Sequence, residues 1–200
     1  MNYLANKKIN MPYKRGDKIT ALNLASINGK QFDIKNMQGK RYMLSFFRFS
    51  ACPFCQLRIH QLISRWQELD DNFTIIAIFD SPLQNLKQHS KRYAAPFYIL
   101  ADEEGKYYRE FAIKYSLLKA VKSMFLKMPT LLYAMMIKGY FPSSLQGKIS
   151  TLPADFLVDE NGIIQTAYYA KDSADHLSFE QVKIFANLNE KPIKLIHGKE

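Results

Sequence analysis

Two cysteines, the only ones in the 200-residue sequence, lie three residues apart at Cys52 and Cys55. A thiolate is the nucleophile of thiol–disulfide exchange, and the unpaired N–H groups at a helix N-terminus favour that anion. Helical spacing of three residues returns both side chains to one face, where they can form a disulfide. Pro53, between them, suits a first helical turn. The pair therefore predicts a redox-active centre, and two unrelated buried cysteines are the alternative.

Metal binding is the other chemistry that paired cysteines can perform. A structural zinc ion needs about four protein ligands. The sequence has no second pair of this kind and offers only scattered histidines, which are His60, His89, His176 and His197. We therefore expect no metal and no cofactor.

The elements that must position the thiols can be predicted on either side of them. Residues 41–49 form a near-continuous apolar and aromatic run, which is typical of a strand buried on both faces. After the cysteines, apolar residues recur at helical spacing from Leu57 to Leu69. The cysteines should thus lie where a strand turns into a helix.

The rest of the chain continues this alternation of strands and helices. The expected strands are 73–79, 97–100, 155–158 and 163–169. One helix is expected from Ser81-Pro82 to Tyr93, a second begins at 102–104, and a third spans 179–188. The expected turns are Asn28-Gly29 and 159–162. This order predicts an α/β fold with a central mixed β-sheet flanked by helices.

Residues 116–140 form a segment that is too long for a simple connection before the last hairpin. We therefore expect a helical insertion, which extends to about residue 148. It is rich in Leu, Met and Phe with interleaved lysines, and we expect helices broken at Pro129. Its longest uncharged run is ten residues, 128–137, too short to span a membrane. The first interpretation is a helix that either covers the core or forms a dimer contact. The second is a helix that lies in the interface of a membrane.

Length and composition favour a single domain over residues 1–200, with its core at about 15–190. The net charge of +10 comes from lysines spread along the chain, so we expect no specific nucleic-acid binding. The first twenty residues contain no apolar run of signal-peptide length, and the expected location is cytoplasmic.

Several segments resemble a known family. They are residues 15–17, 28–30, 38–40 and 46–47, the cysteine pair, and Leu-Pro-Ala-Asp-Phe-Leu-Val-Asp-Glu-Asn-Gly-Ile-Ile at 152–164. Over about 15–115 and 150–190 the chain is similar to the peroxiredoxin-like family of the alkyl hydroperoxide reductase/thiol-specific antioxidant superfamily. That resemblance implies a thioredoxin-like fold, antioxidant activity, and a cis-proline at Pro153 that faces the cysteines.

The sequence also departs from this superfamily. Ala51 replaces the usual Trp of thioredoxins, and Phe46 replaces their buried carboxylate. The peroxiredoxin pattern P-x-x-x-(S/T)-x-x-C fits neither cysteine: measured to Cys55, Cys52 stands at the Thr position and Arg48 at the Pro position. These departures argue against efficient peroxidase activity and leave disulfide exchange intact.

The expected enzyme is a thiol–disulfide oxidoreductase. Cys52, as the more exposed thiolate, would attack a protein or small-molecule disulfide, and Cys55 would resolve the mixed disulfide. A cellular dithiol would then reduce the pair. Arg48 and Arg58 could stabilise the thiolate or bind the carboxylates of glutathione, with solvated surface charges as the alternative.

Two other functions remain open at this point. One is a peroxiredoxin-type thiol peroxidase that reduces hydroperoxides, in which the alignment makes Cys55 the attacking residue. The other is a non-catalytic binding module that keeps the fold and binds through the insertion.

Overall fold

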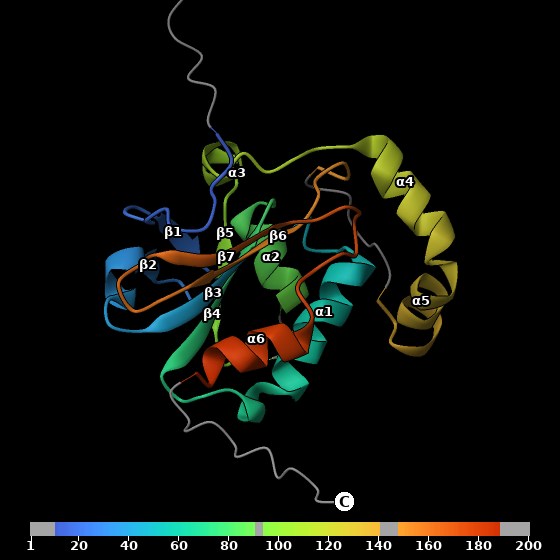
Figure 1. Ribbon diagram of the computed structural model, residues 1–200. Coiled ribbons are helices and arrows are strands. Elements are labelled where there is room, and N and C mark those ends of the chain that lie inside the picture. Colours follow the sequence, from blue (N-terminus) through green and yellow to red (C-terminus); the bar gives the residue numbers. More distant parts are fainter. Residues whose placement is uncertain (1–10, 91–93, 141–147, 189–200) are drawn as a thin grey trace, which may run out of the picture.

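One seven-stranded sheet organises the residues that the structure, a computed structural model, describes: 11–90, 94–140 and 148–188 (Figure 1). The strand order is β2-β1-β5-β4-β3-β6-β7. The strands are β1 Asn23–Ser26, β2 Gln31–Asp33, β3 Arg41–Phe47, β4 Phe73–Phe79, β5 Tyr98–Ala101, β6 Ala154–Val158 and β7 Ile164–Tyr169. β3, β4 and β5 are parallel to one another, whereas β6 runs antiparallel to β3 and β1 antiparallel to β5. This is the expected mixed sheet.

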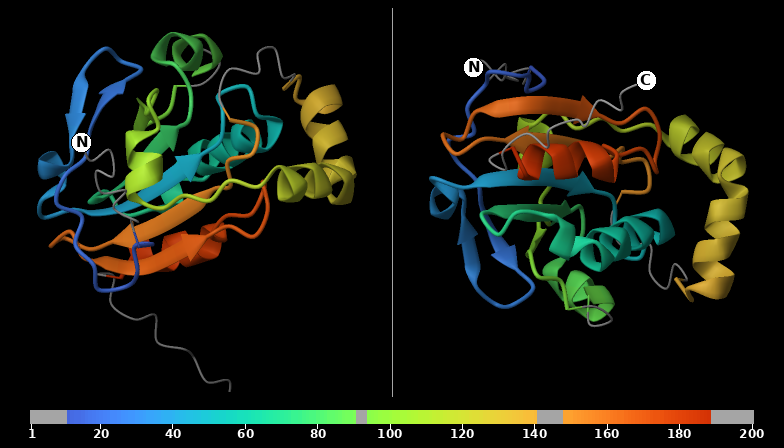
Figure 2. Two further views of the ribbon diagram at one scale, coloured as in Figure 1. Left: turned by 90° about the horizontal axis from the view of Figure 1, so that it is seen from above. Right: turned by 60° about the horizontal axis from the view of Figure 1, so that its bottom comes forward.

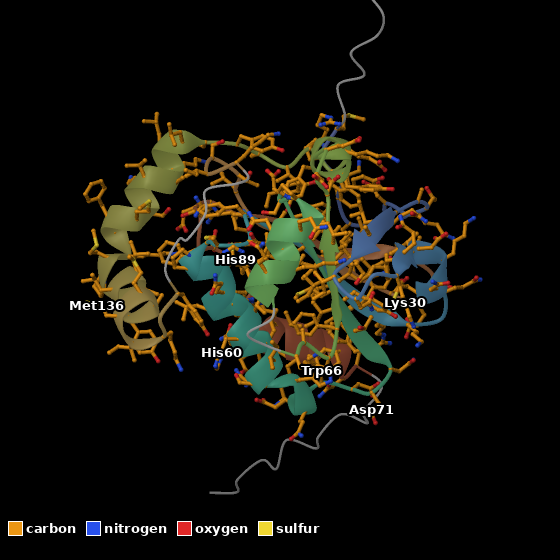
Figure 3. All side chains as sticks on the ribbon, turned by 180° about the vertical axis from the view of Figure 1, so that it is seen from behind. Lys30, His60, Trp66, Asp71, His89 and Met136 are labelled. Carbon is orange, nitrogen blue, oxygen red and sulfur yellow. The ribbon has the colours of Figure 1, made fainter. Side chains whose placement is uncertain are left out.

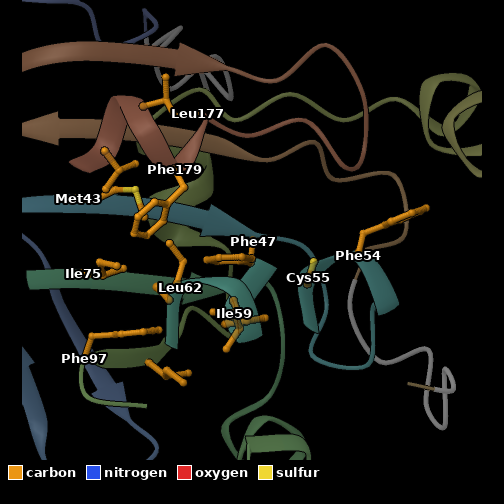
Figure 4. Close-up of a cluster of buried hydrophobic side chains, with 14 of the residues drawn as sticks. Met43, Phe47, Phe54, Cys55, Ile59, Leu62, Ile75, Phe97, Leu177 and Phe179 are labelled. Atoms are coloured by element: carbon orange, nitrogen blue, oxygen red, sulfur yellow. The ribbon is translucent and has the colours of Figure 1, made fainter. Parts of the chain in front are cut away.

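Helices pack on both faces of this sheet. They are α1 Pro53–Ser64, α2 Leu83–Ser90, α3 Lys106–Glu110, α4 Leu117–Leu126, α5 Met128–Leu132 and α6 Phe179–Ala186, with short helical segments η1 Ile34–Met37, η2 Trp66–Glu68 and η3 Tyr133–Ile137. Residues of α1, α2 and α6 share one hydrophobic cluster (Figure 4), and α3 contributes to the other.

The central strand β3 supplies both clusters because its side chains alternate between the faces of the sheet. Met43 and Phe47 pack with the α1 side, whereas Leu44 and Phe46 pack with the α3 side. All four are completely buried. The predicted strand is therefore confirmed, and its carboxyl end leads directly to the cysteines.

The insertion differs from the expected break at Pro129. α4 ends at Leu126, Lys127 is the residue between the two helices, and Pro129 lies in the first turn of α5. A proline is tolerated there because the first helical N–H groups have no partner within the helix. Residues 141–147 of the insertion lie outside the described residues, as do 91–93 at the end of the helix expected from 81.

The insertion stands at one side of the molecule, away from the sheet (Figure 2). Its apolar stripe faces outward, since Leu118, Phe125 and Leu126 are 85%, 70% and 71% exposed. The expectation that this stripe covers the core is wrong, because small residues, Ala120 and Ser123, form the buried face of α4. Within the described residues no single helix is long and apolar enough to cross a membrane; Leu117–Leu126 and Met128–Ile137 meet that test only as a pair bent by 82°.

Candidate active site at the Cys52–Cys55 pair

The cysteines lie where β3 passes into α1, as the sequence predicts. Cys52 is the N-cap residue of α1, in extended conformation, and its carbonyl accepts a hydrogen bond from Gln56 N at 3.0 Å. Pro53 occupies the first turn. No side chain caps this helix end, so its free N–H groups are available to the Cys52 sulfur.

Four donors surround the Cys52 sulfur. Burial disfavours its thiolate, but a hydrogen bond with the Cys55 thiol, the charge of Arg48 and the backbone N–H groups of Cys55 and Phe54 outweigh that effect and lower the pKa of Cys52 to about 6. The Arg48 Nη1 lies 3.5 Å from the Cys52 Sγ. Cys52 is therefore ionised at neutral pH.

Cys55 has the opposite protonation preference. Burial raises its pKa well above that of an ordinary cysteine, and the hydrogen bond and charge of the neighbouring Cys52 raise it further. The charge of Arg48 acts in the other direction and does not overcome them. The site therefore holds one thiolate and one thiol, which is the arrangement that separates an attacking from a resolving cysteine.

The two sulfurs do not differ in exposure, which corrects the expectation that Cys52 is the more exposed. Each cysteine is only 1% exposed. They differ instead in what they face, because Cys52 lines a cavity of about 420 Å³ and Cys55 does not. The insertion contributes Met124, Leu131 and Met135 to the lining of this cavity. Its apolar lining is Phe49, Phe54, Met124, Leu131, Met135 and Ile149.

Arg48 is a fixed part of the site and not a solvated surface charge. It is 2% exposed, its Nη2 donates to the Ile149 carbonyl, and its guanidinium lies 5.4 Å from the centroid of the Phe49 ring. Since the side chain also lines the cavity, it presents a positive charge both to Cys52 and to whatever occupies that space.

Arg58 does not have the role that its position one turn beyond Cys55 suggests. Its hydrogen bonds go to Gln61 Oε1 at 2.7 Å and to the Leu177 carbonyl at 2.8 Å, away from the thiols. Burial lowers its pKa, opposed by the charge of Asp155. Arg58 thus joins α1 to the segment before α6, because its guanidinium points to that segment and not to the helix N-terminus.

Asp155 is a buried carboxylate that sequence reasoning placed in a strand and gave no further role. Its oxygens accept hydrogen bonds from Ser45 Oγ at 2.5 Å and Leu177 N at 2.8 Å, and lie 3.1 Å from His176 Nδ1. Burial raises its pKa, but His176, Arg58 and Ser45 lower it overall. A charged residue inside an otherwise apolar strand was the signal for such a network.

Pro153 precedes β6 in the trans form, so the expectation of a cis bond facing the cysteines is wrong. The bond is part of a regular strand entry. Leu152 N donates to the Lys114 carbonyl at 2.9 Å, and the Pro153 carbonyl accepts from Ala170 N at 3.0 Å. Pro153 is buried but is not among the residues that line the cavity at Cys52.

The histidines are scattered over the structure. Across the described ranges, no group of three or more His, Cys, Asp and Glu side chains could hold a metal ion. His60 is exposed on α1, His176 pairs with Asp155, and His197 lies outside the described residues.

Comparisons with known proteins agree with this fold. The family model described as the AhpC/TSA family matches residues 15–167, whereas no curated protein matches the sequence. The peroxidoxin BcpB from Mycobacterium tuberculosis is similar in structure, with a TM-score of 0.65, 13% identity, and coverage of 89% of this chain and 99% of that one.

Two further solved structures are similar over most of their length. A thiol peroxidase from Chromobacterium violaceum has a TM-score of 0.63 and 11% identity, with 92% and 91% of the two chains covered. A thiol:disulfide interchange protein from Chlorobium tepidum TLS has a TM-score of 0.50 and 19% identity, with 86% and 97% covered. At such identities these likenesses concern the fold, which is thioredoxin-like.

Proposed function

The chain belongs to the AhpC/TSA family, and from that premise we propose that it is a thiol–disulfide oxidoreductase in which Cys52 attacks and Cys55 resolves. One observation supports this above all. The Cys52 sulfur is held as a thiolate by Arg48 and the N-terminus of α1, while the neighbouring Cys55 stays protonated.

The proposed reaction has two steps. The Cys52 thiolate attacks one sulfur of a substrate disulfide, forms a mixed disulfide, and releases the other substrate sulfur as a thiolate that takes up a proton. Cys55 then loses its proton and attacks the Cys52 sulfur, which releases the second substrate thiol. Two electrons have passed to the substrate, and Cys52 and Cys55 are joined. A cellular dithiol restores the pair.

The second step is favoured by what the first one changes. The Cys52 thiolate helps to hold the proton on Cys55, and a mixed disulfide at Cys52 carries no charge. Arg48, which lowers the pKa of both cysteines, then acts on Cys55 alone. Cys55 therefore becomes more acidic when it is needed as the nucleophile.

A thiol peroxidase is the second candidate function, favoured by the apolar cavity over Cys52. In that reaction a hydroperoxide would oxidise the Cys52 thiolate to a sulfenic acid with release of an alcohol or water, and Cys55 would condense with it and release water. The cavity and the low pKa both favour Cys52 as the attacking residue, in place of the Cys55 expected from the alignment.

Trapping experiments test the proposal. With a disulfide substrate, Cys55→Ser should accumulate a mixed disulfide at Cys52, whereas Cys52→Ser should accumulate little. Equal trapping by both variants, or two thiols that remain alkylatable after mild oxidation of the wild type, would contradict the assignment. Dimedone labelling of Cys55→Ser after hydrogen peroxide tests the second candidate, because labelled Cys52 requires a sulfenic acid.

A further inference from the structure

The outer surface of the insertion holds most of the exposed large hydrophobic residues in the part of the chain that the structure describes. Of the fifteen large hydrophobic residues that are exposed among the described ones, eleven lie between 117 and 137. They are Leu117, Leu118, Val121, Met124, Phe125, Leu126, Met128, Leu132, Tyr133, Met136 and Ile137. Scattered apolar residues are normal on a protein surface, but a contiguous patch of this kind marks an interaction site.

The orientation of this surface is determined by specific contacts on its inner side. The Ser123 hydroxyl of α4 is hydrogen-bonded to that of Ser173, and Lys127 forms an ion pair with Asp172 at 3.0 Å. Ala134 is the completely buried residue of η3. The small residues thus face the protein and the large apolar ones face outward, as Figure 3 shows for Met136.

The charge of the same region is entirely positive. From Phe111 to Ala154 the sequence contains six lysines and no Asp or Glu. Lys119 and Lys122 are exposed on α4, and exposed Lys138 follows η3. An amphipathic surface that combines Phe and Leu with flanking lysines is the pattern of helices that lie in the interface of a membrane with anionic lipids.

We propose that α4, α5 and η3 form a docking surface for an anionic lipid bilayer, with the outward side chains placed among the headgroups. A second copy of the chain fits the surface less well, because a symmetric contact would bring the lysines of one copy against those of the other. The two helical stretches are short, and the second is bent by 82° from the direction of the first. The surface therefore lies on the bilayer and does not span it.

The docking surface also borders the cavity at Cys52. Met124, which is 40% exposed, contributes to both, and Leu131 and Met135 line the cavity from the inner side of the same helices. A docked protein would therefore hold its reactive thiolate beneath a helical layer in contact with lipid. This geometry does not require a particular reaction at Cys52, so the docking can be tested by itself.

Cosedimentation of the full chain with vesicles tests the proposal. We expect binding to phosphatidylcholine vesicles that contain phosphatidylglycerol, weak binding to phosphatidylcholine alone, and release at high salt. Phe125→Glu should lower the partition coefficient at least about tenfold, because it places a charge in the apolar contact. Ile184→Glu is the matched control, since Ile184 is 66% exposed on α6, and it should bind as the wild type does.

The lysines have a matched control of their own. Lys119→Gln with Lys122→Gln should weaken binding about fivefold for each lysine, whereas Lys35→Gln with Lys40→Gln, at exposed positions within η1 and shortly after it, should not. Circular dichroism shows that each variant is folded. No binding to anionic vesicles, or equal losses in variants and controls, would overturn the proposal. So would a dimer in gel filtration that Phe125→Glu dissociates without any vesicle binding in the wild type.

Discussion

The Arg48 guanidinium lies 3.5 Å from the Cys52 sulfur and is itself held by the carbonyl of Ile149. It stabilises the thiolate without being consumed by the reaction. The helix N-terminus and the Cys55 thiol act on the same sulfur. The separate contribution of Arg48 can therefore be measured by removing it alone.

Arg48→Met should raise the pKa of Cys52 from about 6 by roughly 1, the effect expected for an opposite charge at this distance. Alkylation by iodoacetamide, followed as a function of pH in the Cys55→Ser background, gives this value. Arg58→Met is the matched control, since Arg58 is also buried but is bonded to Gln61 and Leu177. If both variants shifted the alkylation profile equally, the assignment to Arg48 would be wrong.

At the residue scale the sequence places both cysteines at the start of a helix, which the structure shows, and names two arginines as neighbours of the thiols, of which only Arg48 lies beside Cys52. Spacing alone identifies Cys52 and Cys55 as a pair, because three residues correspond to one helical turn. It cannot distinguish Arg48 from Arg58, since each lies a few residues from a cysteine and only the three-dimensional path of the side chain decides. The expectation that Cys52 is the more exposed cysteine is wrong because residues distant in sequence, among them Met124 and Leu131, enclose it, and spacing within one helix carries no information on them.

The Asp155 network joins three elements of the fold. It links β6 to Ser45 of β3 and to the backbone before α6 at Leu177. Asp155→Asn should lower the free energy of unfolding by about 3 kcal/mol, because it removes the buried negative charge that faces Arg58 and one of the acceptors at the His176 ring. Asp71→Asn, at an exposed position, is the control and should change stability by less than about 0.5 kcal/mol.

The same network predicts a pH dependence. The pKa of Asp155 is lower in the folded protein than in the unfolded chain. The contribution of Asp155 to the free energy of unfolding is therefore complete at pH values above the pKa of an ordinary aspartate. This contribution is lost as the pH falls through the pKa that Asp155 has in the folded protein. The difference in stability between the wild type and Asp155→Asn should shrink in acid, as measured by urea unfolding at several pH values. A difference that does not change with pH would contradict this account.

Residues of α4, α5 and η3 line the cavity at Cys52, and we expect this layer to limit what reaches the thiolate. Met135→Trp should fill part of the cavity of about 420 Å³ and slow the reaction of Cys52 with N-phenylmaleimide about tenfold, the effect of roughly 1.4 kcal/mol of steric cost. Iodoacetamide, which is smaller, should be affected less. Met136→Trp is the matched control because Met136 is 75% exposed and points outward; equal slowing in both variants would exclude the cavity as the route.

At the scale of helices and strands, the regular elements of the sheet can be predicted from the sequence. For the insertion, the sequence predicts the helices but not which of their faces packs on the protein. The strand at 73–79 was found with its observed bounds, since a buried strand has a dense apolar pattern with clear ends. The insertion has an equally clear amphipathic pattern. Periodicity identifies its two faces but does not say which of them meets the protein, and here the small residues do.

The whole molecule divides its charge unevenly. The net charge of +10 is spread along the sequence, yet residues 111–154 contain six lysines and no Asp or Glu, and exposed Lys119, Lys122 and Lys138 lie next to the apolar residues of the insertion. A global count cannot reveal such a surface, because it depends on which lysines the fold brings beside exposed Leu and Phe. This distribution also helps to keep separate copies apart in solution.

The thiolate of Cys52 has an energetic consequence for the whole redox cycle. Arg48 and the N-terminus of α1 stabilise the reduced protein, and the disulfide, which has no charge on sulfur, cannot benefit from them. A couple whose reduced form is stabilised has a higher reduction potential, by about 30 mV for each 1.4 kcal/mol. If the pair cycles as proposed, its return to the dithiol by cellular reductants becomes more favourable and its reduction of substrates less so, and the proposed substrates are therefore those that are themselves strong oxidants.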